Sequence, residues 1–298
     1  MKSRYAPDRG LNVRMGMTLF LIGLLYVVVV GLLLALGVGW FFAMVIAVGG
    51  LVAQWYFSDR MALFGMKARV VTPEQAPQLH AIVDRLCAMA DMPKPRVAIS
   101  DTHLPNAFAT GRSPQRSVVC VTTGLLQRLD PDEVEAVLAH ELSHVAHRDV
   151  LVMTLASVAG VVAGFLTRMV LWGGLGRSRG RDANGAAMVA IVLLVSVLVY
   201  AVSFLLTRVL SRYRELSADR AGALLTGRPA VLASALQKVT GSIAQIPSRD
   251  LRAAENFNAF FFAPALAPGQ SLSNLFATHP PLEKRLENLA KVAAQLGQ

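Results

Sequence analysis

A long apolar run opens the pattern of hydrophobic and polar positions along the chain. Residues 15–58 contain no Asp, Glu, Lys or Arg, and the stretch Gly37-Val38-Gly39 divides the run near its middle. A membrane-spanning helix needs about 20 apolar residues. The run therefore predicts an uncleaved hairpin of two spans, at about 15–36 and 40–57, behind a short basic N-terminal segment.

A second apolar region lies in the middle of the chain. The same length rule predicts two further spans there, at about 150–175 and 183–207. Arg168 interrupts the third span and supports an alternative, in which this pair forms a buried helical hairpin inside a large soluble core. The sequence favours the membrane hairpin and leaves the alternative open.

Basic residues near the span ends predict the orientation in the membrane. They precede the first span and follow the second and fourth: Lys2, Arg4, Arg9, Arg14, Arg60, Lys67, Arg69, Arg208, Arg212, Arg214 and Arg220. This distribution predicts a multi-pass protein of the cell inner (plasma) membrane, with both termini and the polar segments in the cytoplasm. The basic loop at 177–181 would then lie outside, which leaves open whether the second hairpin fully spans the bilayer.

The polar segments on either side of the second hairpin complete the predicted organisation. Residues 59–149 and 208–298 contain about 90 residues each, enough together for one domain of ordinary size. We therefore expect one split domain, interrupted by the hairpin of residues 150–207 and preceded by residues 1–58.

Periodicity and capping residues predict an α+β fold, mostly helical, for the split domain. Thr72, Pro73 and Gln75 form a capping-box pattern that predicts the start of a helix. This helix would present Leu79, Ile82, Val83 and Leu86 on one apolar face. The other predicted elements are a strand at 96–100, paired strands at 106–110 and 118–121, and helices that begin at Pro131, Pro229 and Leu282. The loop at 257–268 receives no assignment.

Composition changes this picture little. Of 298 residues, 54% are hydrophobic and 16% charged, with a mean hydropathy of +0.49; soluble domains average about 45–50% apolar and about 25% charged. The values exclude a disordered chain and disfavour a purely soluble enzyme. Two cysteines, Cys87 and Cys120, exclude a disulfide-rich scaffold and a four-cysteine zinc finger.

The net charge narrows the choice of partners. A formal charge of +10 in such an apolar chain points first to anionic membrane lipid and second to nucleic acid. The basic residues are not interleaved with aromatic ones in a nucleic-acid-binding pattern. We therefore expect contact with membrane lipid and no nucleic-acid partner.

The helix that begins at Pro131 carries the most specific chemistry. It contains His140, Glu141 and His144 in the order His-Glu-x-x-His. Side chains four residues apart lie on the same face of a helix, so two imidazoles can bind one Zn²⁺ with the glutamate beside them. The alternative is a solvated helix with two unrelated histidines.

A catalytic zinc site needs a third protein ligand and an open position. Glu215 is a candidate ligand, and Asp219, four residues later, is placed to hydrogen-bond a ligating histidine. The alternative is a surface helix whose carboxylates pair with adjacent arginines. His147 lies on nearly the same face as His140 and His144, and as a fourth ligand it would close the site and make it structural.

Four sequence blocks together resemble the HtpX-like integral-membrane zinc metalloproteases, which are related to the type-1 CAAX prenyl proteases. The blocks are LAHELSH at 138–144, RELSAD at 214–219, PNAFATG at 105–111 and THPPLEKR at 278–285. The resemblance covers roughly residues 71–289. His147, where relatives often have Asn or Lys, and the basic loop at 177–181 depart from the family pattern.

The resemblance implies a thermolysin-like (gluzincin) catalytic domain with one Zn²⁺ per chain. It makes His140, His144 and Glu215 the zinc ligands, Glu141 the catalytic base and Asp219 a carboxylate that supports a ligand. It also implies that Asn106, Ala107, Phe108 and Ala109 form an edge strand that holds substrate, and that His279 helps to stabilise the tetrahedral intermediate. Without the family match, His279 before two prolines would be interpreted as shaping a helix start.

The function expected from the resemblance is a zinc endopeptidase that cleaves unfolded or damaged membrane proteins at the cytoplasmic membrane surface. Its partners would be protein or peptide substrates and membrane lipid; the sequence leaves the oligomeric state open. Two rival functions are a non-enzymatic membrane protein with a structural zinc and a prenyl-CAAX processing enzyme. The second needs a large intramembrane chamber, for which four short spans are too few.

Overall fold

A computed structural model describes residues 55–149, 183–244 and 279–298, together with scattered positions before residue 55 and residues 152 and 153. The chain divides into two compact units. The first comprises Met1–Leu11, Tyr56–Val150 and Ser211–Gln298, and the second comprises Asn12–Trp55 and Leu151–Leu210. The backbone therefore leaves the first unit after Val150 and returns to it at Ser211.

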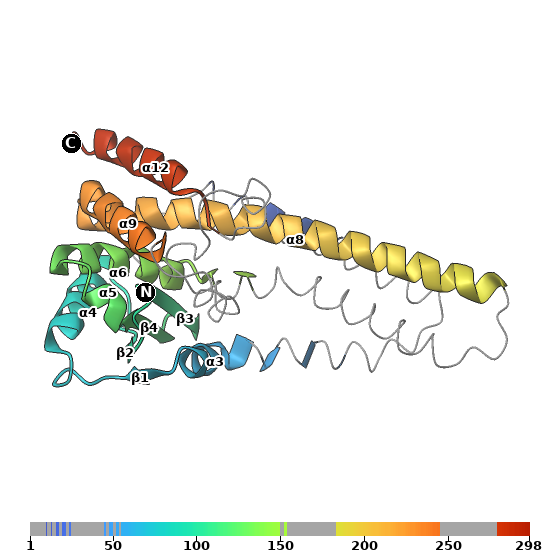
Figure 1. The fold of residues 1–298 in the computed structure, drawn as a ribbon, viewed down its shortest axis with the longest axis horizontal. Coiled ribbons are helices and arrows are strands. Elements are labelled where there is room, and N and C mark those ends of the chain that lie inside the picture. The colour runs from blue at the N-terminus through green and yellow to red at the C-terminus, as the bar shows by residue number, and fades with distance from the viewer. Residues whose placement is uncertain are drawn as a thin grey trace. The chain divides into compact units, whose positions relative to one another are not determined.

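The described part of the first unit is an α+β structure, mostly helical, with one small sheet (Figure 1). Its strands are β1 (Ala68–Val70), β2 (Arg96–Ser100), β3 (Ala107–Ser113) and β4 (Arg116–Thr122). Its helices are α3 (Ser58–Gly65), α4 (Pro77–Ala90), α5 (Thr123–Leu126), α6 (Pro131–Ala146), α9 (Pro229–Ala244) and α12 (Leu282–Gln295). Helix α8 (Ala183–Thr226) belongs to both units.

The sheet has the strand order β1-β2-β4-β3. Strands β2 and β4 are parallel, with Ala98 opposite Cys120, whereas β3 and β4 form an antiparallel hairpin, with Ala109 opposite Val119. These strands confirm the three that the sequence predicts. Strand β1 was not predicted, because three residues with a half-exposed pattern give no clear alternation. Strand β3 occupies one edge of the sheet.

The predicted start of the first helix is wrong by one turn. Helix α4 begins at Pro77, with Ala76 as its N-cap residue, and not at Pro73. A residue before proline is disfavoured in the helical region, and Ala76 accordingly has φ −144° and ψ 64°. The side chain of Gln75 does accept the Thr72 N–H at 3.0 Å, but it does so within a turn.

Helices cover both faces of the sheet. The larger core joins the sheet to α4, α6, α9 and α12, and its fully buried members include Val83, Val119, Leu138 and Leu236. The predicted apolar face of α4 lies in this core, with Ile82 only partly buried. On the opposite face, Ala62 of α3 packs against side chains such as that of Phe108.

The N-terminal end of α6 ties the two halves of the first unit together. Asp130 and Glu133 form a capping box, and Pro131 occupies the first turn, as the sequence predicts. Lys238 of α9 donates hydrogen bonds to both carboxylates, at 3.0 Å to Asp130 and 2.8 Å to Glu133. Ser234 donates to Glu133 at 2.7 Å. Helix α6 is therefore held by residues more than a hundred positions away in sequence.

Helix α8 contains the fourth predicted span. Within the described residues, it is the one helix long and apolar enough to cross a membrane; the candidate stretch is Leu193–Thr226, and its most apolar 18-residue window has a mean hydropathy of 2.2. Only 18% of its most apolar window is buried, which is unlike the core helix of a soluble protein. The other three predicted spans, the loop at 177–181 and the loop at 257–268 lie mostly or wholly outside the described residues.

A glycine allows α8 to approach α6 closely. A Cβ atom added to Gly222 would lie 2.8 Å from the backbone nitrogen of His140 and 3.1 Å from the carbonyl carbon of Ala139. Real Cβ atoms are not found so close to backbone, so the two helices touch at a point where only glycine fits.

Replacing Gly222 with alanine should force α8 away from α6. We expect the Gly222→Ala protein, purified in detergent, to lose about 1–3 kcal/mol of stability and to melt at a lower temperature. Gly241→Ala in α9 is the matched control, because a Cβ there meets nothing within 4 Å and alanine favours a helix by up to about 1 kcal/mol. Equal melting temperatures for the two variants would contradict the close approach.

Candidate metal centre

Three side chains from two helices converge at the contact between α6 and α8. His140 and His144 come from α6 and Glu215 from α8, and one potential ligand atom from each lies within 4.8 Å of the others. The two Nε2 atoms are 3.3 Å apart. Glu215 places Oε2 3.6 Å from Nε2 of His140 and Oε1 3.5 Å from Nε2 of His144. The structure thus brings together the three residues that the sequence predicts as metal ligands, and these three side chains are called the metal group below.

The spacing of these atoms fits a zinc ion. Zinc binds imidazole nitrogen and carboxylate oxygen at about 2.0–2.2 Å, so two ligands of a tetrahedral ion lie about 3.3–3.6 Å apart. The two imidazole nitrogens are 3.3 Å apart, and each has one Glu215 oxygen at such a distance: Oε1 lies 3.5 Å from His144 and Oε2 lies 3.6 Å from His140. His140 and Glu215 are both buried, and three protein ligands would leave one coordination position open.

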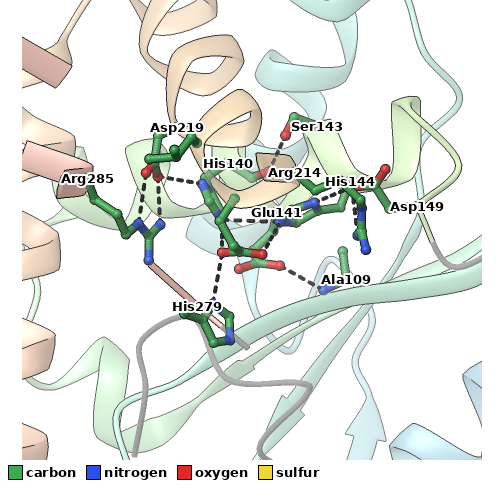
Figure 2. Close-up of polar contacts among 12 residues, drawn as sticks. Ala109, His140, Glu141, Ser143, His144, Asp149, Arg214, Asp219, His279 and Arg285 are labelled. Carbon is green, nitrogen blue, oxygen red and sulfur yellow. Dashed lines mark hydrogen bonds and ion pairs between the residues drawn. The ribbon is translucent and has the colours of Figure 1, made fainter. Parts of the chain in front are cut away.

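The carboxylate of Asp219 contacts His140 at Nδ1, the ring nitrogen that does not face Glu215, and the guanidinium of Arg285 contacts that carboxylate (Figure 2). Asp219, which is fully buried, lies with Oδ1 2.9 Å from Nδ1 of His140. Arg285 of α12 donates two hydrogen bonds to Asp219, at 2.8 and 2.6 Å. Burial lowers the pKa of His140, but its hydrogen bonds with Asp219 and Glu215 outweigh burial and raise the pKa to about 9. The pocket therefore favours a positive charge.

His144 has a similar arrangement behind it. Nδ1 of His144 lies 2.5 Å from Oδ2 of Asp149, and the same oxygen accepts a hydrogen bond from Nη2 of Arg214 at 2.8 Å. The sequence analysis placed none of Asp149, Arg214 and Arg285 in the site. Arg214 and Arg285 lie at the ends of two of the quoted blocks, and Asp149 lies five residues after His144, but the pairing of each arginine with its aspartate arises from the tertiary fold.

Glu141 lies on α6 between the two histidines in sequence and is buried. Its Oε2 accepts a hydrogen bond from the backbone N–H of Ala109 at 3.1 Å. Burial raises the pKa of Glu141, and the neighbouring His140 and His144 partly offset that effect. A buried carboxylate with a raised pKa beside a metal group is suited to accept and return a proton.

The remaining predicted residues surround this group. Nδ1 of His279 lies 3.0 Å from Oε2 of Glu215, so the segment before α12 reaches the metal group. Asn106 and Ala107 are buried at the start of β3. The side chain of Phe108 packs into the apolar cluster with Ala62, so only its backbone can serve a peptide.

His147 does not join the metal group. It is the C-cap residue of α6, and its Nδ1 donates to the carbonyl oxygen of Ser143 at 2.8 Å. Among the described residues, the cluster with ligand spacing contains His140, His144 and Glu215 and not His147. The interpretation of His147 as a fourth ligand therefore finds no support in this geometry.

Comparison with known proteins gives a consistent result. The profile of Peptidase family M48 matches residues 73–293. Protease HtpX homolog 1 of Streptomyces coelicolor is 59% identical over 298 residues, which are 100% of this chain and 98% of that protein. Protease HtpX homolog of Moorella thermoacetica is 50% identical and covers 99% of both chains. Protease HtpX homolog 2 of Methanosarcina acetivorans is 47% identical over 99% of this chain and all of its own.

A solved structure shares the fold. The crystal structure of S. mikatae Ste24p superimposes with a TM-score of 0.54 and 19% sequence identity. The match covers 90% of this chain and 62% of the Ste24p chain. At this identity the likeness is one of fold, and it agrees with the mostly helical α+β architecture described above.

The pair of Arg285 and Asp219 makes the first prediction about the site. Replacing Arg285 with methionine leaves the Asp219 carboxylate buried without its guanidinium, which should cost about 3–5 kcal/mol of folding free energy. Denaturant unfolding of the purified protein, followed by circular dichroism, measures this loss. Lys284→Met is the matched control, since Lys284 is exposed on the same helix. If both variants unfold like the parent protein, the pair contributes nothing to stability.

Proposed function

The chain belongs to peptidase family M48, and from that premise we propose that it is a zinc endopeptidase that cleaves unfolded or damaged membrane proteins at the cytoplasmic membrane surface. Its relatives identify it more broadly as a membrane-associated metallopeptidase with protein substrates and a metal ion. The finer statements, which concern zinc, the substrate class and the side of the membrane, are the proposal.

One observation carries the proposal. Glu141 lies within the same turn of α6 as both histidines of the metal group, and its carboxylate also contacts the edge strand β3 through Ala109. The proton acceptor, the metal group and a strand able to bind an extended peptide are therefore adjacent. A structural zinc site would require neither a proton acceptor nor a peptide-binding strand beside the ligands.

The chemistry follows from the position of each group. His140, His144 and Glu215 would hold a zinc ion, which would act as a Lewis acid on a peptide carbonyl and on a water molecule. Glu141 would accept a proton from the attacking water and pass it to the leaving amine. The Nδ1 atom of His279 lies 3.0 Å from Oε2 of Glu215, and this proximity supports the proposal that His279 would donate a hydrogen bond to the developing oxyanion.

Strand β3 is proposed as the substrate platform. It lies at an edge of the sheet, and the N–H of Ala109 bonds to a side chain of α6 rather than to β4. An exposed edge can pair with an extended peptide as an additional strand. Binding through the backbone of residues 106–109 would select extended chains over folded ones, which suits unfolded substrates.

The continuity of α8 supports a substrate at the membrane. The same helix that is apolar enough to cross a bilayer carries Glu215 and Asp219 into the first unit. Glu215 lies about 12 Å along the helix from residue 207, the end of the fourth predicted span. The basic residues around the predicted spans favour the cytoplasmic side.

Replacing Glu141 with glutamine removes the proton acceptor and keeps the shape of the side chain. We expect the zinc-loaded Glu141→Gln protein to retain zinc and to lose cleavage of an unfolded model protein by at least a hundredfold, because general base catalysis contributes about 10²–10⁴-fold. Zinc content measured on the same sample shows that the site is intact. Activity near that of the parent protein would exclude Glu141 as the base.

Zinc content separates the candidate ligands. Glu215→Gln should lower the zinc content of the purified protein, because it removes one of three ligands, whereas His147→Gln should leave it at one ion per chain. Elemental analysis after dialysis measures both. Loss of zinc from His147→Gln with retention in Glu215→Gln would replace the proposed ligand set and favour a closed, structural site.

A further inference from the structure

Asp149 and Arg214 form a buried pair at the edge of the metal group. Both side chains are nearly inaccessible to solvent, with 2% of Asp149 and 9% of Arg214 exposed. A single oxygen, Oδ2 of Asp149, contacts Nδ1 of His144 at 2.5 Å and Nη2 of Arg214 at 2.8 Å. The carboxylate thus joins the guanidinium to the imidazole in one short chain (Figure 2).

We propose that Asp149 and Arg214 are positioning residues for His144, and that they fix its imidazole with Nε2 directed at the metal. The inference rests on the proposed function and deepens it. An imidazole that donates its Nδ1 proton to a carboxylate keeps Nε2 unprotonated and available as a ligand. Nε2 of His144 does face the other donors, 3.3 Å from His140 and 3.5 Å from Glu215.

Arg214 acts on His144 through Asp149. A carboxylate this deeply buried is costly unless it is paired, and Arg214 supplies the opposite charge. Asp149 therefore lies between the guanidinium and the imidazole and contacts both through Oδ2.

The pair also joins the two places where the backbone passes between the units. Asp149 directly precedes Val150, where the chain leaves the first unit, and Arg214 lies three residues after Ser211, where it returns. Arg214 is bonded in sequence to Glu215, another residue of the metal group. The ion pair between Asp149 and Arg214 therefore joins the two ends of the first unit that border the inserted segment, and it also contacts the ligand His144.

Metal retention tests this role directly. The variants are Asp149→Asn, Arg214→Met, Arg214→Lys and the double variant Asp149→Asn with Arg214→Met, each as the full chain in detergent. Zinc release to a chromogenic chelator gives the affinity, and cleavage of an unfolded model protein gives kcat and KM separately. Arg85→Gln is the control: it breaks a 2.7 Å pair with Glu135, which lies on the same helix α6, five residues before His140.

Asp149→Asn and Arg214→Met should each weaken zinc binding by about 10–100-fold, the usual effect of losing a partner of a metal-binding histidine. Their double variant should be no worse than Asp149→Asn alone, because Arg214 acts through Asp149. Arg214→Lys should fall between the parent protein and Arg214→Met. The activity lost should appear in kcat more than in KM, and Arg85→Gln should bind zinc normally.

Normal zinc affinity in Asp149→Asn with native helix content overturns the proposal, as does a double variant whose loss is the product of the single losses. Should Asp149→Asn fail to fold, equal zinc affinity in Arg214→Lys, Arg214→Met and the parent protein overturns it instead. If the parent protein binds zinc but cleaves nothing, the proposed function fails, while the zinc affinities still decide the role of the pair.

Discussion

The structure of the site depends on the close packing of α6 against α8. Gly222 lets the two helix backbones touch beside His140, and this contact sets the distance from the histidines of one helix to Glu215 of the other. A tetrahedral ion tolerates only small changes in the separation of its ligands. The capping box of α6 and the bonds from α9 to its first turn hold the same helix in place from its other end.

The site gathers several buried carboxylates, and two arginines balance their negative charge. The metal group is buried, and the carboxylates in and around it, those of Glu215, Glu141, Asp149 and Asp219, would repel one another in the absence of positive charge. Each histidine has an aspartate behind it, and each aspartate has an arginine: Asp219 with Arg285, and Asp149 with Arg214. Both arginines follow the predicted second hairpin in sequence, whereas both histidines precede it, so charge balance at the site depends on both segments of the split domain.

Local signals explain what the sequence predicts well and what it does not. Asp130, Pro131 and Glu133 cap α6 within four residues, so its start is confirmed, and the spacing of His140 and His144 follows from the helix repeat. The start of α4 was wrong because Thr72 and Gln75 bond similarly in a turn, while Pro77 determines where the helix begins. The pairs of Asp149 with Arg214 and of Asp219 with Arg285 could not be predicted locally, because the two members of each pair lie more than 60 residues apart in sequence.

The central claim is that two helices build an open zinc site from two imidazoles and one carboxylate. X-ray absorption spectroscopy at the zinc edge of the purified, zinc-loaded chain tests it most directly, because it counts imidazole ligands in solution. The account predicts two imidazoles, with the remaining ligands oxygen from Glu215 and water. Three or more imidazoles would contradict it, since either His147 or His279 would then have to bind the metal and the site would have a different ligand set.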